Sequence, residues 1–164
     1  MPTDFQGIIQ LLVNSRINFI LIGGVAANLH GSARLTYDVD VVYARDGGNV
    51  RRLADALQPY SPYLRGAPPG LPFCWDEKTI RLGLNFTLII SLGDVDVLGE
   101  VAGGGTYEQL LPFSDETSAF GVKFRCVGLE RLIQLKRAAG RPKDLESIAE
   151  LQALLEERRK LESK

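Results

Sequence analysis

The chain has 164 residues, a length that favours a single domain spanning residues 1–164. Hydrophobic residues make up 45% and charged residues 24% of it, as is usual for a soluble globular protein. The formal net charge of −1 argues against a strongly basic protein that coats nucleic acid, although it leaves room for a local basic patch. One histidine, two isolated cysteines and no C-x-x-C pair argue against a zinc site.

We expect a cytoplasmic protein that does not engage a membrane. No run of apolar residues reaches the 18 or so needed to cross a bilayer. The N-terminus carries Asp4 and no basic region before its apolar run, so we expect no signal peptide. Cys74 and Cys126 each stand in an apolar context, and we expect both to be buried, reduced thiols.

The first predicted elements surround a stretch from Gly23 to Val42. Apolar residues spaced by three and four predict a helix over 3–15, and the run NFILIG predicts a buried strand over 18–23. Gly23 and Gly24 break this strand, and the alanine-rich segment 25–30 suits a short helix. DVDVVY predicts a second strand over 38–43, with its two aspartates on one face.

The rest of the chain mixes helices and strands. We expect a helix over 50–57, a proline-rich loop over 58–72, a strand near 79–82, and a hairpin of strands over 85–90 and 94–98. A glycine-rich connection over 99–105, a short helix over 107–111 and a strand over 122–127 follow. Two helices, over 129–139 and 143–159, close the chain. Because the elements do not strictly alternate, we expect an α/β or α+β domain with a mixed sheet, flanking helices and a C-terminal helix pair.

Asp38 and Asp40 are the strongest candidates for a metal site. Two carboxylates one pleat apart repel each other and are costly to desolvate, so a cation should neutralise them. A third carboxylate would complete a site for two Mg²⁺ (or Mn²⁺) ions about 3.5–4 Å apart, an arrangement that suits phosphate chemistry. Asp96 has apolar neighbours on both sides and fits this role better than Asp94, which follows the turn at Gly93. The alternative is that these aspartates lie at strand ends and face water.

Several other residues fit a phosphate site, each with a structural alternative. Gly23 and Gly24 would let a phosphate approach free N–H groups at a helix start, although a tight turn explains them equally well. Lys136 falls on the apolar face of its helix, so it either extends to an edge or points into a charged cleft. His30 is as easily a packed histidine as a functional one. Arg34, in a polar loop, would pair with a triphosphate or with the aspartates.

Together these residues resemble the nucleotidyltransferase superfamily, which has the DNA polymerase β-like fold. Its pattern is Gly-Gly or Gly-Ser at a strand-to-helix turn, D-x-D or D-x-E on the next strand, and a third carboxylate on a later strand. GGVAANLHGSARLTYDVDVV and GDVDVLGE match these parts. LERLIQLKRAAGRPKDLESIAEL is similar to the C-terminal helices of small bacterial members, including toxin-like and abortive-infection groups. Glu146 departs from the toxin-like relatives, many of which have a further aspartate there.

The resemblance implies transfer of a nucleoside monophosphate from a nucleoside triphosphate, such as ATP, to an acceptor, with release of pyrophosphate. Asp38 and Asp40 would bind the Mg²⁺ or Mn²⁺ ions. Asp96 would bind one metal and orient or deprotonate the acceptor hydroxyl. Gly23 and Gly24 would hold the β- and γ-phosphates.

The same resemblance places Arg34, Lys136 and Lys143 among the nucleotide-binding residues. It leaves the acceptor open between RNA or tRNA, a protein and a small molecule. A toxin–antitoxin or defence context would add a partner protein from a neighbouring gene. The alternative is a non-catalytic nucleotide-binding or toxin–antitoxin interaction protein of the same fold. A third reading, a small-molecule transferase of the antibiotic-modifying type, has the short chain against it.

Overall fold

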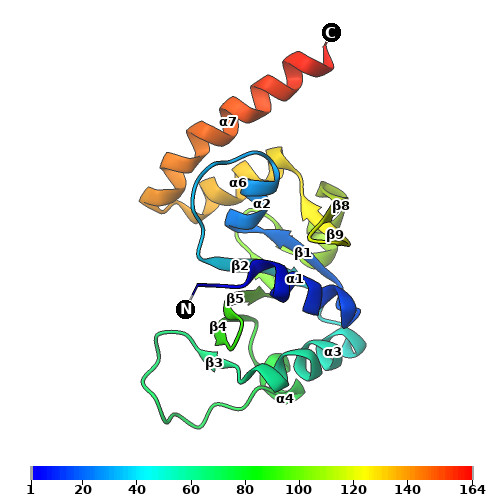
Figure 1. The fold of residues 1–164 in the computed structure, drawn as a ribbon, viewed down its shortest axis with the longest axis vertical. Coiled ribbons are helices and arrows are strands. Elements are labelled where there is room, and N and C mark those ends of the chain that lie inside the picture. The colour runs from blue at the N-terminus through cyan, green and yellow to red at the C-terminus, as the bar shows by residue number, and fades with distance from the viewer. Residues whose placement is uncertain (1, 164) are drawn as a thin grey trace.

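The computed structural model describes residues 2–163 and contains a seven-stranded mixed sheet flanked by helices (Figure 1). The helices are α1 (Phe5–Asn14), α2 (Gly23–Leu29), α3 (Gly47–Leu57), α4 (Glu77–Leu82), α5 (Tyr107–Leu110), α6 (Leu129–Ala139) and α7 (Pro142–Glu162). The strands of the sheet are β1 (Phe19–Ile22), β2 (Asp38–Tyr43), β3 (Tyr63–Leu64), β4 (Asn85–Ile90), β5 (Gly93–Leu98), β8 (Ser114–Ala119) and β9 (Val122–Val127). A separate two-stranded ribbon joins β6 (Glu100–Val101) to β7 (Gly105–Thr106).

The strand order is β3-β4-β5-β2-β1-β9-β8. The pairs β2–β5 and β1–β9 are parallel, and the other pairs in the sheet are antiparallel. This confirms the predicted mixed sheet and the predicted β4–β5 hairpin. The C-terminal helix pair also lies where it was predicted, with α6 over 129–139 and α7 over 142–162.

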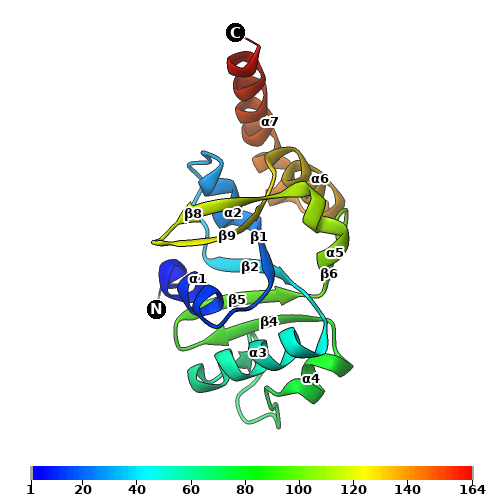
Figure 2. The same ribbon diagram turned by 90° about the vertical axis from the view of Figure 1, so that its right-hand side faces the viewer.

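The helices cover the sheet unevenly. Helix α2 packs on β1 and β2, while α1 packs on β2 and β9. All four residues of β1 are therefore buried, whereas β4 alternates between exposed and buried positions. Figures 1 and 2 show α6 and α7 at one end of the sheet and α3 and α4 at the other. One face of β4 is consequently left open to solvent.

Capping side chains fix the helices that frame the sheet. Asp4 accepts a hydrogen bond from Gly7 N at the start of α1, and Asp46 accepts one from Asn49 N at the start of α3. The buried amide of Asn49 accepts from Asn18 N at 2.7 Å and donates to Ala44 O at 2.7 Å. This one side chain therefore ties α3 to the chain segments flanking β1 and β2.

Four sequence-based expectations about the elements were wrong or incomplete. The segment 79–82, predicted as a strand, belongs to helix α4, because the Asp76 side chain accepts a hydrogen bond from Thr79 N and caps a helix there. The proline-rich loop contains the short strand β3, and the glycine-rich connection contains the β6–β7 ribbon. The edge strand β8 (SDETSA) was missed because it lacks apolar alternation; it pairs with β9 across a turn at Phe120 and Gly121 with positive φ.

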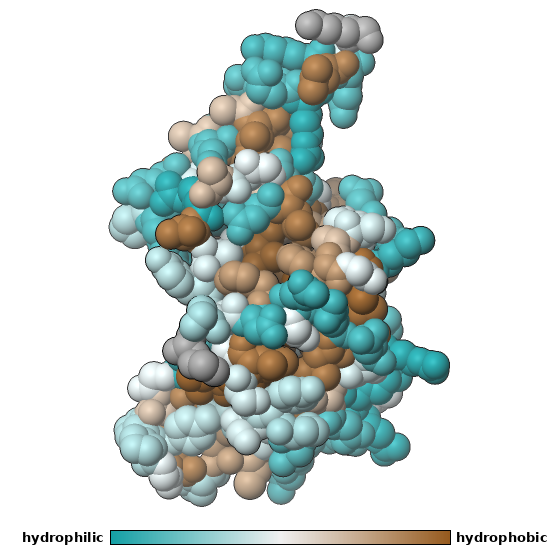
Figure 3. Space-filling view, viewed as in Figure 1, coloured by the Kyte–Doolittle hydropathy of each residue, from teal (hydrophilic) through white to brown (hydrophobic). Residues whose placement is uncertain are grey.

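Apolar side chains on the face shown in Figure 3 gather in the middle, where α2 and α6 lie in Figure 1, and α7 is largely hydrophilic. Among the helices of residues 2–163, none is both long enough and apolar enough to cross a membrane.

Candidate active site

The two strands that carry the aspartates pair in parallel, with Asp38 opposite Asp94 and Asp40 opposite Asp96. Residues paired in this way point to the same face of a sheet, so four carboxylates gather on one face. Val39 and Val95 are fully buried on the opposite face. The alternation of D-V-D-V on both strands thus puts charge on one side and core on the other.

Three of these carboxylates form a tight cluster. Asp38, Asp40 and Asp96 each offer an oxygen that lies within 4.8 Å of the others. Asp94 lies next to this cluster but outside it. The structure therefore brings together the three aspartates chosen from the sequence. Asp96 belongs to the cluster and Asp94 does not, as their flanking residues suggested.

Asp40 has the least favourable environment for a charged carboxylate in the cluster. Its Oδ1 atom is buried and has no hydrogen-bond partner among residues 2–163. Burial, followed by the charges of Asp38 and Asp96, raises the pKa of Asp40 well above its ordinary value. Burial and the charge of Asp96 also raise the pKa of Asp38, while Arg65 and Lys143 oppose that shift. Such a set of converging carboxylate oxygens suits a hard divalent cation, Mg²⁺ or Mn²⁺.

The glycine pair lies directly against the carboxylates. Gly23 has φ +73°, and a Cβ atom there would overlap Asp40 Oδ2. A Cβ atom at Gly24 would overlap Thr36 Oγ1. Within the described residues, helix α2 starts at Gly23 without a side-chain cap, which leaves its first N–H groups available. Glycine is therefore required here by the close approach of β2, and the same close approach puts a helix start beside the metal-type cluster.

Arg65 is a further residue of the site that the sequence did not indicate. It follows β3 in the proline-rich loop, and its Nη2 donates to Asp96 Oδ1 at 2.6 Å. The same nitrogen lies 3.7 Å from Asp38 Oδ2, and Nε lies 4.0 Å from Asp94 Oδ2. Arg65 thus bridges three carboxylates from two strands, on the side of the cluster away from the glycine turn.

The C-terminal helices supply a cationic wall. Lys136, with 16% of its side chain exposed, lies 3.9 Å from Asp144 Oδ1, and burial lowers its pKa. Arg141 donates to Asp144 Oδ2 through Nε at 2.7 Å. Asp144 itself is 2% exposed, so it holds both cations at the start of α7. The predicted cleft position of Lys136 agrees with the structure, but its ion-pair partner is Asp144 and not one of the strand aspartates.

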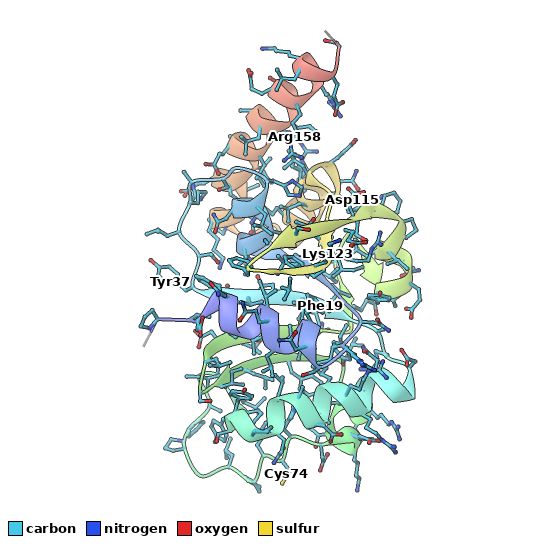
Figure 4. All side chains as sticks on the ribbon, turned by 45° about the vertical axis from the view of Figure 1, so that its right-hand side comes forward. Phe19, Tyr37, Cys74, Asp115, Lys123 and Arg158 are labelled. Atoms are coloured by element: carbon cyan, nitrogen blue, oxygen red, sulfur yellow. The ribbon has the colours of Figure 1, made fainter. Side chains whose placement is uncertain are left out.

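Two sequence candidates have other partners. Arg34 forms an exposed ion pair with Glu146 at 3.3 Å, and no ion pair with the aspartates. His30 Nε2 lies 2.7 Å from Val127 O, and Arg158 Nη2 donates to its Nδ1 at 2.9 Å. Figure 4 shows Arg158 on the part of α7 above α2. His30 is thus a packed residue that fixes α7, which settles the alternative that the sequence left open in favour of packing.

One cavity of about 410 Å³ lies between the glycine turn, the aspartate strands and the C-terminal helices. Each predicted metal or nucleotide residue contributes to its lining: Gly23, Gly24, Arg34, Asp38, Asp40, Asp96, Lys136 and Lys143. Leu35 and Tyr37 form part of its rim and are 84% and 74% exposed; Tyr37 points away from the body in Figure 4. The cavity thus places carboxylates, a helix start and lysines around one volume.

The cysteines lie outside this cavity and differ from each other. Both are free thiols; Cys126 is buried on β9, as expected, and its pKa is raised to about 12 by burial. Cys74 is exposed, which corrects the expectation that it is buried (Figure 4). The reason is its place in the irregular segment before α4, where its neighbours Phe73 and Trp75 pack inward and Cys74 between them faces solvent.

Comparisons with known proteins identify the fold. No protein-family model matches the chain, and no protein of curated function matches its sequence. A Thermotoga maritima protein that is provisionally assigned as a nucleotidyltransferase is 17% identical, with a TM-score of 0.56 over 90% of this chain and 89% of that one. The lincosamide antibiotic adenylyltransferase LnuA, in its lincomycin-bound structure, is 16% identical, with a TM-score of 0.59 over 93% of this chain and 98% of that one. The chain therefore has a nucleotidyltransferase-like fold, as the motifs predicted.

Proposed function

We propose that this chain is a metal-dependent nucleotidyltransferase, which moves a nucleoside monophosphate from a nucleoside triphosphate to an acceptor and releases pyrophosphate. One observation carries the proposal: Asp38, Asp40 and Asp96 offer oxygens within 4.8 Å of one another, and a buried oxygen of Asp40 has no partner. An uncompensated buried carboxylate is costly to a fold, and a cation held by the cluster would offset that cost. The likeness to two nucleotidyltransferase-type structures supports the same reaction class.

The three aspartates would hold Mg²⁺ or Mn²⁺. When bound, the metal would supply positive charge to the phosphate oxygens and to the attacking oxygen. Asp38 and Asp40, which lie on one strand, would both hold the metal, and Asp40 lies directly against the glycine turn. Asp96 is the ligand on the acceptor side, where a carboxylate would orient an acceptor hydroxyl and take up its proton.

The triphosphate would lie between the glycine turn and the C-terminal helices. The N–H groups at the start of α2, at Gly23 and Gly24, are suited to the β- and γ-phosphates. Lys136 and Lys143 line the same cavity from the opposite wall and would add charge to the phosphate site. Arg34 would join them by leaving Glu146, an exchange that costs little because the pair is exposed.

The acceptor is best sought among small molecules as well as RNA, tRNA and proteins. LnuA, an antibiotic adenylyltransferase, is matched by this chain over 98% of its length. The short chain is therefore no argument against a small-molecule acceptor. The open face of β4, beside Asp96, leaves room for an acceptor of any of these classes. A toxin–antitoxin or defence role would additionally require a partner protein, which co-purification with the product of a neighbouring gene would detect.

Label transfer tests the proposed reaction. The protein is incubated with Mg²⁺ or Mn²⁺, each of four α-³²P-labelled nucleoside triphosphates, and separate pools of RNA, protein and small metabolites that include antibiotics. We expect label in one pool, with equimolar pyrophosphate release, and a loss of at least 10³-fold in Asp96→Asn. Asp55→Asn, a change on the exposed side of α3, is the matched control and should keep full activity. Folded wild-type protein that labels no pool with any triphosphate would favour the non-catalytic binding protein.

A further inference from the structure

The guanidinium of Arg65 occupies the place that a cation would take among the strand carboxylates. It lies 2.6 Å from Asp96 Oδ1 and 3.7 Å from Asp38 Oδ2, and both residues belong to the three-aspartate cluster. Only 26% of its side chain is exposed. Although burial acts in the opposite direction, the hydrogen bond and charge of Asp96 raise the pKa of Arg65, so it stays charged. The cluster thus already contains one positive charge supplied by the chain.

This charge cannot stay in place when a divalent cation binds. The oxygen of Asp96 that accepts from Arg65 belongs to one of the three residues whose oxygens converge. Like charges a few ångströms apart in a partly buried site repel by several kcal/mol at the effective dielectric constant of about 20 that applies near protein surfaces. Arg65 and the metal therefore compete for Asp96 and Asp38.

We propose that Arg65 is a built-in counter-ion, which neutralises the carboxylate cluster in the metal-free protein and leaves it when metal binds. The proposal rests on the metal site of the proposed function and adds a regulatory element to it: the metal affinity is set by a competitor within the chain. Arg65 holds the cluster together until the metal replaces it.

Asp94 provides an alternative carboxylate partner for Arg65. Its backbone N donates to Thr87 O and its Nη1 donates to Leu88 O at 3.0 Å, so strand β4 holds both the backbone of Arg65 and one nitrogen of its guanidinium. Asp94 lies 4.0 Å from Nε and outside the three-aspartate cluster. A turn of the guanidinium about its Nη1–Leu88 O hydrogen bond would exchange Asp96 for Asp94 without moving the backbone. On this account Asp94 is the carboxylate that receives Arg65 in the metal-loaded protein.

Mn²⁺ titrations followed by the electron paramagnetic resonance of the free ion test this exchange. Arg65→Gln removes the competitor, so we expect roughly tenfold tighter Mn²⁺ binding, within the 5- to 150-fold range usual for coupled sites. Asp94→Asn removes the receiving carboxylate and should weaken binding several-fold. Arg51→Gln, which breaks the exposed pair with Glu77, is the control and should change nothing. Unchanged or weaker binding by Arg65→Gln would overturn the proposal, because a residue that merely orients Asp96 would help the metal.

The wild-type protein provides an independent measurement. We expect the NMR signal of Arg65 Nε–H, assigned by its absence from Arg65→Lys, to shift in step with Mg²⁺ binding. A signal that stays fixed while the metal site saturates would overturn the exchange. Wild-type protein that binds no divalent cation would overturn the proposed function together with this inference. Tight wild-type binding without a response at Arg65 would overturn only the inference.

Discussion

Replacing Asp40 by asparagine is expected to stabilise the metal-free protein while removing its metal-dependent chemistry. Asp40 Oδ1 is buried without a partner, and the neighbouring charges of Asp38 and Asp96 act against its ionised form. Asparagine keeps the shape of the side chain, removes its charge and offers an N–H donor to Asp96. The substitution therefore removes a destabilising buried charge that the folded protein keeps at its candidate active site.

The magnitude follows from the cost of one poorly compensated charge. Removing it should raise the free energy of unfolding by about 1–2 kcal/mol, the scale of one unsatisfied buried group. In a chain of this length each kcal/mol shifts Tm by roughly 2–4 °C, so Asp40→Asn should melt about 2–8 °C higher. Because the pKa of Asp40 lies above its ordinary 3.8, the folded state binds the proton more tightly than the unfolded state. The destabilisation by the Asp40 charge is therefore absent below pH 3.8 and is complete above the raised pKa. The Tm difference between Asp40→Asn and the wild type should widen as pH rises from 3.8 through the raised pKa.

Thermal melts in EDTA and in Mg²⁺ measure both effects. Asp55→Asn, an exposed change on α3, should stay within about 0.5 kcal/mol of the wild type in each buffer. Mg²⁺ at about 100 times its Kd should stabilise the wild type by about 2.7 kcal/mol and Asp40→Asn far less, which reverses the order of the two proteins. If Asp40→Asn melts below the wild type in EDTA, or gains as much from Mg²⁺, the reasoning is refuted.

Three further changes probe the surroundings of the cluster. Gly23→Ala should lower Tm by several degrees and weaken Mn²⁺ binding, because the added Cβ would overlap Asp40. The control is Gly66→Ala, at φ +84° in open space, which should cost only the backbone strain of about 1–2 kcal/mol. Equal Tm losses and unchanged Mn²⁺ binding would contradict this packing argument. Lys136→Met should weaken triphosphate binding roughly 10- to 100-fold in calorimetric titrations, the loss of one charged hydrogen bond, with little change in Tm; an unaltered affinity would exclude Lys136 from the nucleotide site. Burial lowers the pKa of His30 below its ordinary 6.5, so the folded state favours the neutral imidazole. The stability that neutral His30 contributes should therefore be lost as pH falls below about 6.5, and His30→Gln should lack this pH-dependent loss. A Tm difference between these two proteins that does not change with pH would show that His30 is not the titrating group.

Local sequence patterns predicted the position of a side chain correctly where that position depends on a single helix or strand. The period of two in DVDVVY predicted that Asp38 and Asp40 share a face, and the strand pairing bears this out. The helical phase of Lys136 predicted its position on the inner side of α6, where it lines the cavity. The fold could be predicted because the glycine turn lies close in sequence to the first aspartate strand, and the second aspartate strand repeats the same D-V-D-V alternation.

Features that depend on tertiary pairing could not be predicted in this way. Arg65 lies in an aperiodic, proline-rich segment and reaches the aspartates only because β3 pairs with β4 at the sheet edge. Glu146, the partner of Arg34, comes from a helix more than 100 residues away. The helix at 77–82 was mistaken for a strand because Thr79 and Ile80 are β-branched, whereas the Asp76 cap decides its conformation. For Arg65 and Arg34 the deciding contact is absent from the local pattern, whereas the Asp76 cap is a local signal that the β-branched residues outweighed in the strand prediction.

Crystals grown with Mn²⁺ and a non-hydrolysable nucleoside triphosphate test the central claim most directly, because manganese can be located by its anomalous scattering. We predict manganese bound to Asp38, Asp40 and Asp96, with the β- and γ-phosphates at Gly23 and Gly24. Full nucleotide occupancy with no manganese at the three carboxylates, or a triphosphate bound away from the glycine turn, would contradict the account.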